Sequence, residues 1–272
     1  MKNHNVISNI KLTVITVVFN DENHIKDTIE SIINQDYPLI EYIVIDGKSN
    51  DNTLNIIQKY KKKIHTLISE NDDGIYDAMH KGIKLASGNY INFMHSGDSF
   101  YSSNTVSSVV KKIDFNQDII YGNYYVKYPT GIGRVETSHK PEYIWKPFFN
   151  QQCAFYKTSI LKNQPFDTKY YIAADFFFTI KSFSNGSNIY KINEVICNSL
   201  KGGFSNKHEF ETIKQYYKII KEFNLNNKKL YYYKKIIWIF FIEKTVKVIL
   251  PIKLFYFIQN YFRKIIPINK MF

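Results

Sequence analysis

The sequence predicts an α/β fold, with a mostly parallel β-sheet flanked by helices. Two observations lead to this prediction. Short β-branched apolar runs alternate with amphipathic segments over about the first 110 residues, and the connections between them are short. Several of the runs also end in polar clusters that contain acids, as strands do at the ligand-binding edge of a parallel sheet.

Four runs are predicted to be buried strands, because they are apolar and too short for helices: residues 12–19, 42–45, 64–69 and 90–94. The segments between them carry apolar residues at helical spacing, as Ile25, Ile29 and Ile32 do before the break at Tyr37-Pro38. Helices are predicted to begin near Thr53 and after Gly74. A helix near 104–112 and a strand near 118–125 follow.

Three predicted strands end in acid-containing clusters: Asn20-Asp21-Glu22, Asp46, and Ser96-Gly97-Asp98. The carboxyl ends of parallel strands lie on one edge of a sheet, so we expect these acids to line one crevice. Asp46 has an alternative role, in which Asp46-Gly47 only forms a turn between a strand and a helix.

The sequence lacks the phosphate-binding motifs of two large nucleotide-binding classes. Neither GxGxxG nor GxxxxGK[ST] is present, which argues against a Rossmann dehydrogenase and a P-loop NTPase. A crevice rich in acids suits a diphosphate when a divalent cation neutralises its charge.

Composition bounds the remaining possibilities. The two cysteines, Cys153 and Cys197, have no metal-binding or CxxC spacing, and we expect reduced cytosolic thiols. Neither a signal-peptide core nor an apolar run long enough to span a bilayer is present in the sequence. From residue 206 onward, 14 Lys and Arg against 4 Asp and Glu supply 10 of the 12 net positive charges. An acidic surface is therefore the expected partner of this tail alone.

Several segments, in order, resemble family 2 glycosyltransferases. These are VVFNDE, DGKSNDNT, SENDDGIYDAMHKGI and ASGNYINFMHSGDSF, followed by the Asn150, Asp175 and Gly202 regions. Together they span roughly residues 12–205, and GIYDAMHKG is similar to the branch that builds bacterial surface polysaccharides. The resemblance implies a GT-A fold and transfer of a sugar, hexosyl or N-acetylhexosaminyl, from a nucleotide diphosphate donor to an acceptor hydroxyl with inversion.

The resemblance also implies which residues bind the donor. Asp46 would contact the nucleotide base, most simply the uracil of a UDP-sugar, and the Asn20-Asp21-Glu22 loop would line base and ribose. Further donor contacts fall on Asp73, Gly74, Ser96 and Gly97.

The family's metal motif, Asp-any-Asp, is altered in this chain. His95-Ser96-Gly97-Asp98 places His95 and Gly97 at the two acid positions. We expect Asp98 to hold a divalent cation, Mn²⁺ or Mg²⁺, with His95 assisting Mn²⁺. The alternative for His95 is a polar residue at the rim of the site.

On the acceptor side, the resemblance assigns the catalytic base to Asp175, the one acid within an apolar stretch. Burial of that carboxyl would raise its pKa, which suits proton abstraction. The alternative is an N-cap for the helix that follows. Gln151 and Gln152 stand where the family often has a His-Gln pair, and Gly202-Gly203 would hinge a loop over the donor.

Residues 228–272 alternate basic with aromatic and aliphatic residues. This pattern is typical of helices lying in a membrane interface, and the alternative is a helical pair packed on the catalytic domain or on a second subunit. We expect a donor-binding half at 1–125, an acceptor-binding half at 126–205 and a helical, membrane-associating tail at 206–272. The expected location is the inner face of the cell membrane, with a lipid-linked glycan as acceptor, no nucleic acid as partner, and a homodimer as one arrangement open to the chain.

Two rival functions remain open. The altered metal motif fits a non-catalytic nucleotide-sugar-binding scaffold of a polysaccharide assembly complex. A sugar nucleotidyltransferase shares the α/β plan, but it would need a basic, glycine-rich phosphate loop near the N-terminus, which the sequence lacks.

Overall fold

The computed structural model describes residues 10–127, 133–141, 147–200 and 208–225, and six residues between 230 and 238. The chain divides into two compact units. The first comprises Met1–Glu142 and Phe148–Lys201, and the second comprises Tyr143–Pro147 and Gly202–Phe272. The predicted donor-binding half, 1–125, lies in the first unit, as do residues 126–142 and 148–201 of the predicted acceptor-binding half. Gly202, Gly203 and most of the basic tail at 228–272 lie outside the described residues.

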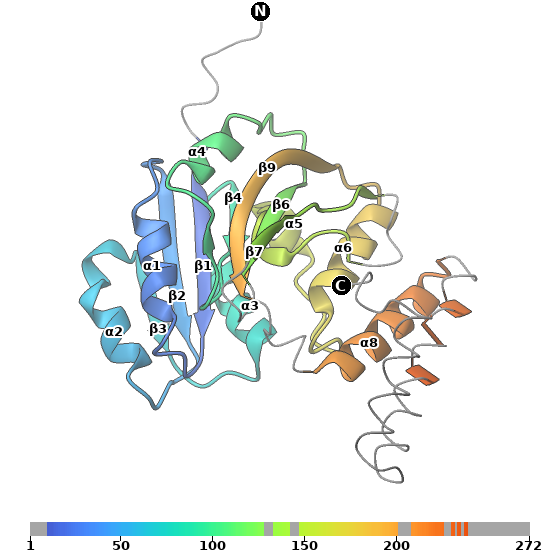
Figure 1. Ribbon diagram of the computed structural model, residues 1–272, viewed down its shortest axis with the longest axis horizontal. Helices are drawn as coiled ribbons and strands as arrows, with labels where there is room; N and C mark the ends of the chain where they lie inside the picture. Colours follow the sequence, from blue (N-terminus) through green and yellow to red (C-terminus); the bar gives the residue numbers. More distant parts are fainter. Residues whose placement is uncertain are drawn as a thin grey trace, which may run out of the picture. The chain divides into compact units, whose positions relative to one another are not determined.

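The first unit is an α/β structure around one curved sheet (Figure 1). Its first strands are β1 (Leu12–Val18), β2 (Ile40–Asp46), β3 (Thr66–Ser69) and β4 (Tyr90–Phe93), in the spatial order β3-β2-β1-β4. All three pairings among them are parallel. The helices between them are α1 (Ile25–Ile33), α2 (Thr53–Lys59) and α3 (Ile75–Leu85), and a short 3₁₀ turn, Lys61–Lys63, precedes β3. The predicted α/β alternation is confirmed for this part of the chain.

The rest of the sheet is mixed, which limits the prediction of a mostly parallel sheet to its first half. The remaining elements are β5 (Ser99–Phe100), α4 (Thr105–Val110), β6 (Ile119–Lys127), β7 (Gly133–Glu136), a 3₁₀ turn at Gln151–Cys153, β8 (Ala154–Lys157), α5 (Thr158–Asn163), α6 (Ala174–Ser184) and β9 (Ile189–Leu200). Strand β8 lies between β4 and β6 and is antiparallel to both. Strand β6 runs parallel to β9, while β5 and β7 add antiparallel pairings.

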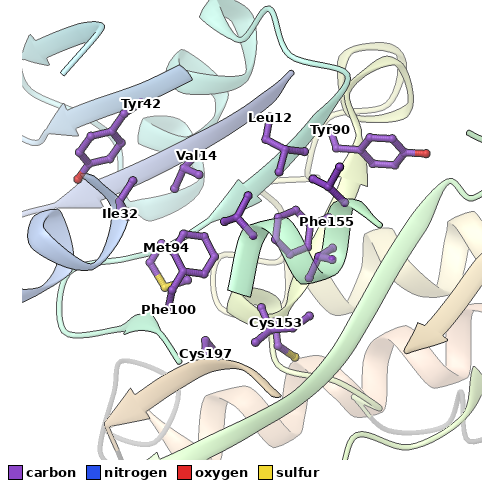
Figure 2. Close-up of a cluster of buried hydrophobic side chains, with 14 of the residues drawn as sticks. Leu12, Val14, Ile32, Tyr42, Tyr90, Met94, Phe100, Cys153, Phe155 and Cys197 are labelled. Carbon is purple, nitrogen blue, oxygen red and sulfur yellow. The ribbon is translucent and has the colours of Figure 1, made fainter. Parts of the chain in front are cut away.

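Side chains on both faces of β1, β2 and β4 are buried, as the continuous apolar runs of these strands predict. On one face, Val14 and Tyr42 belong to a core cluster with Ile32 of α1, and Figure 2 shows this cluster continuing to Phe155 and Cys153 of the second half. On the other face, a Cβ on Gly82 of α3 would lie 2.7 Å from Ile15, so α3 packs directly against β1. Helices therefore cover both faces.

The described part of the second unit is the helix α8 (Glu209–Glu222) with a few residues after it. No helix among the described residues is both long and apolar enough to cross a bilayer.

Candidate functional site

Strand order places a ligand-binding position beside β1. The chain moves from β1 to β2 and β3 on one side and then returns to β4 on the other, so β1 and β4 form a topological switch point. Open α/β sheets bind ligands outside the carboxyl ends of the strands at such a point. The loops at this edge follow Val18, Asp46, Ser69 and Phe93, and they contain nearly all the predicted donor-binding residues.

The first two loops are joined by reciprocal hydrogen bonds. The Asn20 backbone N–H donates to Ser49 Oγ at 2.8 Å, and the Asn50 N–H donates to Asn20 Oδ1 at 2.9 Å. The Asn52 N–H donates to Glu22 Oε2 at 3.0 Å. Asn20 and Lys48 both hold positive φ angles, 49° and 61°, which are costly outside glycine. The side chains of Asn20 and Glu22 thus brace the neighbouring loop.

Asp46 lies beneath this loop pair and is fully buried. Its carboxylate accepts hydrogen bonds from Ser49 Oγ at 2.5 Å and from Ser69 Oγ at 2.6 Å. The Ser49 N–H adds contacts of 3.2 Å to both oxygens. Asp46 therefore fixes the conformation of the turn after β2, and two hydroxyls cover its oxygens.

The loop after β3 brings Asp72, rather than the predicted Asp73, to the other two loops. A Cβ on Gly47 would lie 2.6 Å from Asp72 Oδ2, so only glycine allows this approach. Asp72 Oδ1 also accepts from the Gly74 N–H at 2.9 Å, and Gly74 has a φ of 105°. Asp73 is exposed, and its donor-binding role stays a prediction. Asp72 was not among the predicted residues, and its contact with Gly47 depends on the turn geometry.

Phe19 is a second feature that sequence reasoning missed. It was predicted as the last residue of a buried strand, but 62% of it is exposed, beside Gly47 at the carboxyl edge of β1. An exposed aromatic ring beside polar loops offers a flat surface to a planar ligand.

The loop after β4 joins Asp21 to the acceptor-side residues. Ser96 Oγ donates to Asp21 Oδ2 at 2.6 Å, and the opposite oxygen of Asp21 lies 2.6 Å from His24 Nδ1. Gly97, with a φ of 93°, turns the chain so that Asp98 points back toward the sheet, where it is 8% exposed. There Gln152 Nε2 donates to Asp98 Oδ2 at 2.8 Å. Predicted donor and acceptor residues thus meet at this turn.

His95 pairs with Gln151 in the same place. Its Nε2 lies 3.0 Å from Gln151 Oε1. With that amide oxygen as acceptor, Nε2 carries the proton and Nδ1 keeps its lone pair. Burial lowers the pKa of His95, so the neutral ring dominates at neutral pH.

Within the part of the chain that the structure describes, three buried polar atoms at this turn have no hydrogen-bond partner: His95 Nδ1, Gln151 Nε2 and Gln152 Oε1. Buried polar groups are nearly always paired, so their clustering marks a place built to receive a polar ligand. Within the described residues no group of three or more His, Cys, Asp and Glu forms a ready-made metal site. Asp98 and the lone pair of His95 nevertheless fit a cation that arrives on a diphosphate, which itself supplies the remaining ligands.

Asp175 lies in the first turn of α6 and is partly buried. The helix is capped at Ala173 without a side-chain bond, so the N-cap alternative for Asp175 is wrong. Burial raises the pKa of its carboxyl, and a hydrogen bond from Tyr76 acts in the opposite direction. The Tyr76 hydroxyl lies 2.9 Å from Asp175 Oδ1.

Comparisons with known proteins agree with this architecture. The sequence model described as "Glycosyl transferase family 2" matches residues 13–183. A "PGL/p-HBAD biosynthesis glycosyltransferase" of Mycobacterium tuberculosis is 27% identical over 186 residues, which is 65% of this chain and 72% of that protein.

Solved structures show the same fold. TarS of S. aureus, in complex with UDP-GlcNAc, aligns with a TM-score of 0.64 and 22% identity over 84% of this chain and 70% of that one. The mannosyltransferase PcManGT from Pyrobaculum calidifontis, in complex with GDP-Man and Mn²⁺, aligns with a TM-score of 0.63 and 18% identity over 80% of this chain and 65% of that one. The family match covers more than half of the chain, so the chain belongs to the family 2 glycosyltransferases, with a GT-A-like fold.

Proposed function

We propose that this glycosyltransferase moves a sugar from a UDP-sugar to an acceptor hydroxyl with inversion at the anomeric carbon. The observation that carries the proposal is the turn after β4. There Asp98, from the donor-side loops, contacts Gln152, and His95 contacts Gln151. A donor diphosphate and an acceptor must meet at one such place for direct transfer.

The charge of the loops supports a requirement for a divalent cation. Residues 19–24, 46–53, 69–74 and 94–98 contain eight Asp and Glu residues against one Lys, Lys48. A diphosphate cannot approach so many carboxylates unless a cation neutralises its charge. Asp98 would hold Mn²⁺ or Mg²⁺, with His95 Nδ1 as an additional ligand for Mn²⁺. The cation would stabilise the charge of the departing diphosphate.

The base and ribose of the donor would occupy the edge formed by the first three loops. Phe19 offers its exposed ring to the base, and Asp72 and Asp46 offer carboxylates to its N–H groups. Contact with Asp46 requires displacement of a serine hydroxyl, since Ser49 and Ser69 cover its oxygens. The loop residues Asn20, Asp21, Glu22, Gly74, Ser96 and Gly97 would shape this pocket.

Asp175 would act as the general base. It takes the proton of the acceptor hydroxyl while the acceptor oxygen bonds to the anomeric carbon, and the bond from that carbon to the diphosphate breaks with its electron pair leaving on the diphosphate. A single displacement of this kind inverts the anomeric centre. The pKa raised by burial makes Asp175 a stronger base than an exposed aspartate.

The acceptor we propose is a lipid-linked surface glycan. The basic and aromatic composition of residues 228–272 supports attachment to an anionic membrane surface, here the inner face of the cell membrane. The division into a donor half at 1–125, an acceptor half at 126–205 and a tail at 206–272 remains part of this proposal, as does the hinge role of Gly202 and Gly203.

Calorimetric titration with UDP, GDP and their sugar derivatives, with and without Mn²⁺, tests the donor site. We expect UDP binding that needs Mn²⁺ and that is lost in Asp98→Ala. Asp114→Ala, in the turn after α4, is the matched control and should bind normally. Equal UDP affinity without metal would contradict the cation requirement.

A non-catalytic sugar-nucleotide-binding scaffold is the second candidate, favoured by His95 and Gly97 at the family's acid positions. Metal-dependent donor binding with neither hydrolysis nor transfer, across a panel of lipid-linked acceptors, would support the scaffold.

A further inference from the structure

Tyr76 connects the donor-side helix α3 to Asp175. It lies in the first turn of α3 and is 6% exposed. Its hydroxyl is 2.9 Å from Asp175 Oδ1 and 3.1 Å from the Ile172 carbonyl oxygen, and the Asp175 N–H approaches it at 3.4 Å. The bonds join residues 99 positions apart in the chain. Tyr76 is thus a direct link between the loop at Gly74 and the proposed base.

Aromatic packing holds the Tyr76 ring in this position. Its centroid lies 5.6 Å from that of Phe166, and Phe166 packs in turn at 5.3 Å against Phe178 of α6. Phe178 and Asp175 both belong to α6, so the helix that carries the carboxylate also supports the Tyr76 ring through Phe166. The hydroxyl therefore cannot move away from Asp175 without disturbing packed side chains.

A carboxylate in this setting needs a donor both to stay ionised and to stay oriented. Burial raises the pKa of Asp175, while the Tyr76 bond lowers it. Tyr156 of β8 also faces Asp175, but burial raises the pKa of Tyr156 well above its usual value, so it stays a neutral phenol. Backbone N–H groups of Asp175 and Phe176 also lower this pKa, but Tyr76 is the one side chain that hydrogen-bonds Oδ1 among the described residues.

We propose that Tyr76 is a positioning residue for the base Asp175, fixing the orientation of its carboxylate and favouring its ionised form through the hydrogen bond to Oδ1. The inference rests on the proposed role of Asp175 as base. Since Tyr76 follows the Asp72–Gly74 turn by two residues, it ties the geometry of the donor edge to that of the base.

The test compares Tyr76→Phe with Tyr90→Phe. Tyr90 is also fully buried, and its hydroxyl donates to the Gln117 carbonyl oxygen at 2.7 Å, at the other end of β4. Both variants keep the ring and lose one buried hydroxyl, so each controls for the loss of a buried polar group. Only Tyr76→Phe removes a bond to Asp175.

The readout is the titration of Asp175 by carbon NMR in protein labelled at the aspartate carboxyl carbons, with the signal assigned from Asp175→Asn. We expect the pKa of Asp175 to rise in Tyr76→Phe, because the hydrogen bond that lowers it is lost, and to stay unchanged in Tyr90→Phe. An unchanged Asp175 titration in Tyr76→Phe would overturn the proposal.

Donor hydrolysis, with water as acceptor, separates this proposal from the one on which it rests. We expect kcat to fall about tenfold in Tyr76→Phe, with KM for the donor unchanged. The acid limb of the pH profile of kcat should move to higher pH in this variant. If Asp175→Asn remains active, the role of Asp175 as base fails. If Asp175→Asn is inactive but Tyr76→Phe behaves like Tyr90→Phe, only the role of Tyr76 fails.

Discussion

The two ends of strand β2 each carry a buried, hydrogen-bonded carboxylate, Glu41 and Asp46, but the loops around them differ. At the amino end, Glu41 accepts from Lys11 Nζ at 2.9 Å, Thr13 Oγ1 at 2.6 Å and the Ser87 N–H at 2.7 Å, as well as from the Ser87 hydroxyl. Burial raises the pKa of Glu41, but these donors outweigh it and lower the pKa to about 2. At this end of the strand, hydrogen-bond donors therefore surround both oxygens of the Glu41 carboxylate.

At the carboxyl end of the strand, the loops contain residues with positive φ angles, and buried polar atoms nearby lack hydrogen-bond partners. Four of the seven described residues with positive φ are at this edge, namely Asn20, Lys48, Gly74 and Gly97. The unpaired atoms of His95, Gln151 and Gln152 belong to the neighbouring turn. Strain and unsatisfied polar groups lower stability, and they persist where a ligand later uses them. The contrast separates a stabilising hydrogen-bond network from the edge that we propose as the substrate site.

The largest effect should come from Asp175→Asn, which we expect to lower the transfer rate at least a thousandfold without unfolding the protein. The raised pKa means that ionisation of Asp175 above that pKa costs stability. The variant should therefore melt about 2 °C higher at neutral pH, and the difference should vanish below the usual range of an aspartate. A lower melting temperature, measured by calorimetry, would place Asp175 with the stabilising network instead.

Asp98→Ala should lower activity about a hundredfold and weaken activation by Mn²⁺. Steady-state rates across a Mn²⁺ series check this expectation. Asp98→Asn is the conservative partner, because it keeps a side-chain oxygen for Gln152 Nε2 but loses the charge. If the Asn variant responds to Mn²⁺ as the parent does, the carboxylate is not the ligand.

Glu41→Gln should have the opposite profile, with normal donor binding and reduced stability. A pKa lowered from 4.5 to about 2 contributes stability above pH 4.5, and this contribution is lost as the pH falls toward 2. We expect a loss of about 2 kcal/mol at neutral pH in urea denaturation. Glu30→Gln, at a half-buried position on α1 where the carboxylate accepts from the Tyr60 hydroxyl, is the control. Loss of sugar-nucleotide binding in Glu41→Gln would contradict the distinction between the two ends of β2.

Ser96→Ala should have the smallest effect. The variant loses the bond of 2.6 Å from Ser96 Oγ to Asp21 Oδ2 but keeps the turn. We expect the KM for the donor to rise about threefold while kcat is unchanged, in initial-rate measurements. A large change in kcat would show that Asp21 takes part in the chemical step.

The parallel half of the sheet was predictable because its strands are β-branched runs that alternate with periodic helices. The antiparallel half was not predictable in the same way. Strand β8 has four residues, Ala154–Lys157, and β5 has two, which is too short for a periodic signal. The insertion of β8 between β4 and β6 depends on long-range packing, as in the contact of Phe155 with the core.

The sequence was sufficient to predict which loops form the candidate site, but not which side-chain contacts form within it. The acids were predicted to gather because the carboxyl ends of parallel strands share an edge. The contact of Asp72 with the Gly47 loop depends on the turn at Gly74, and exposure of Phe19 depends on where β1 leaves the sheet. Neither the His95–Gln151 pair nor the Tyr76–Asp175 bond leaves a local signal, since each joins distant parts of the chain.

The pairing of β6 with β9 has a consequence for how the protein is made. Strands β1 to β4 neighbour one another within residues 12–93, whereas Ile119 of β6 pairs with Ile189 of β9. During synthesis β1, β2 and β3 have all their sheet partners early, whereas β4 must wait for β8, and β6 must wait for β8 and β9. We therefore expect the donor edge to assemble first on the ribosome, and the acceptor side to be the part that chaperones protect.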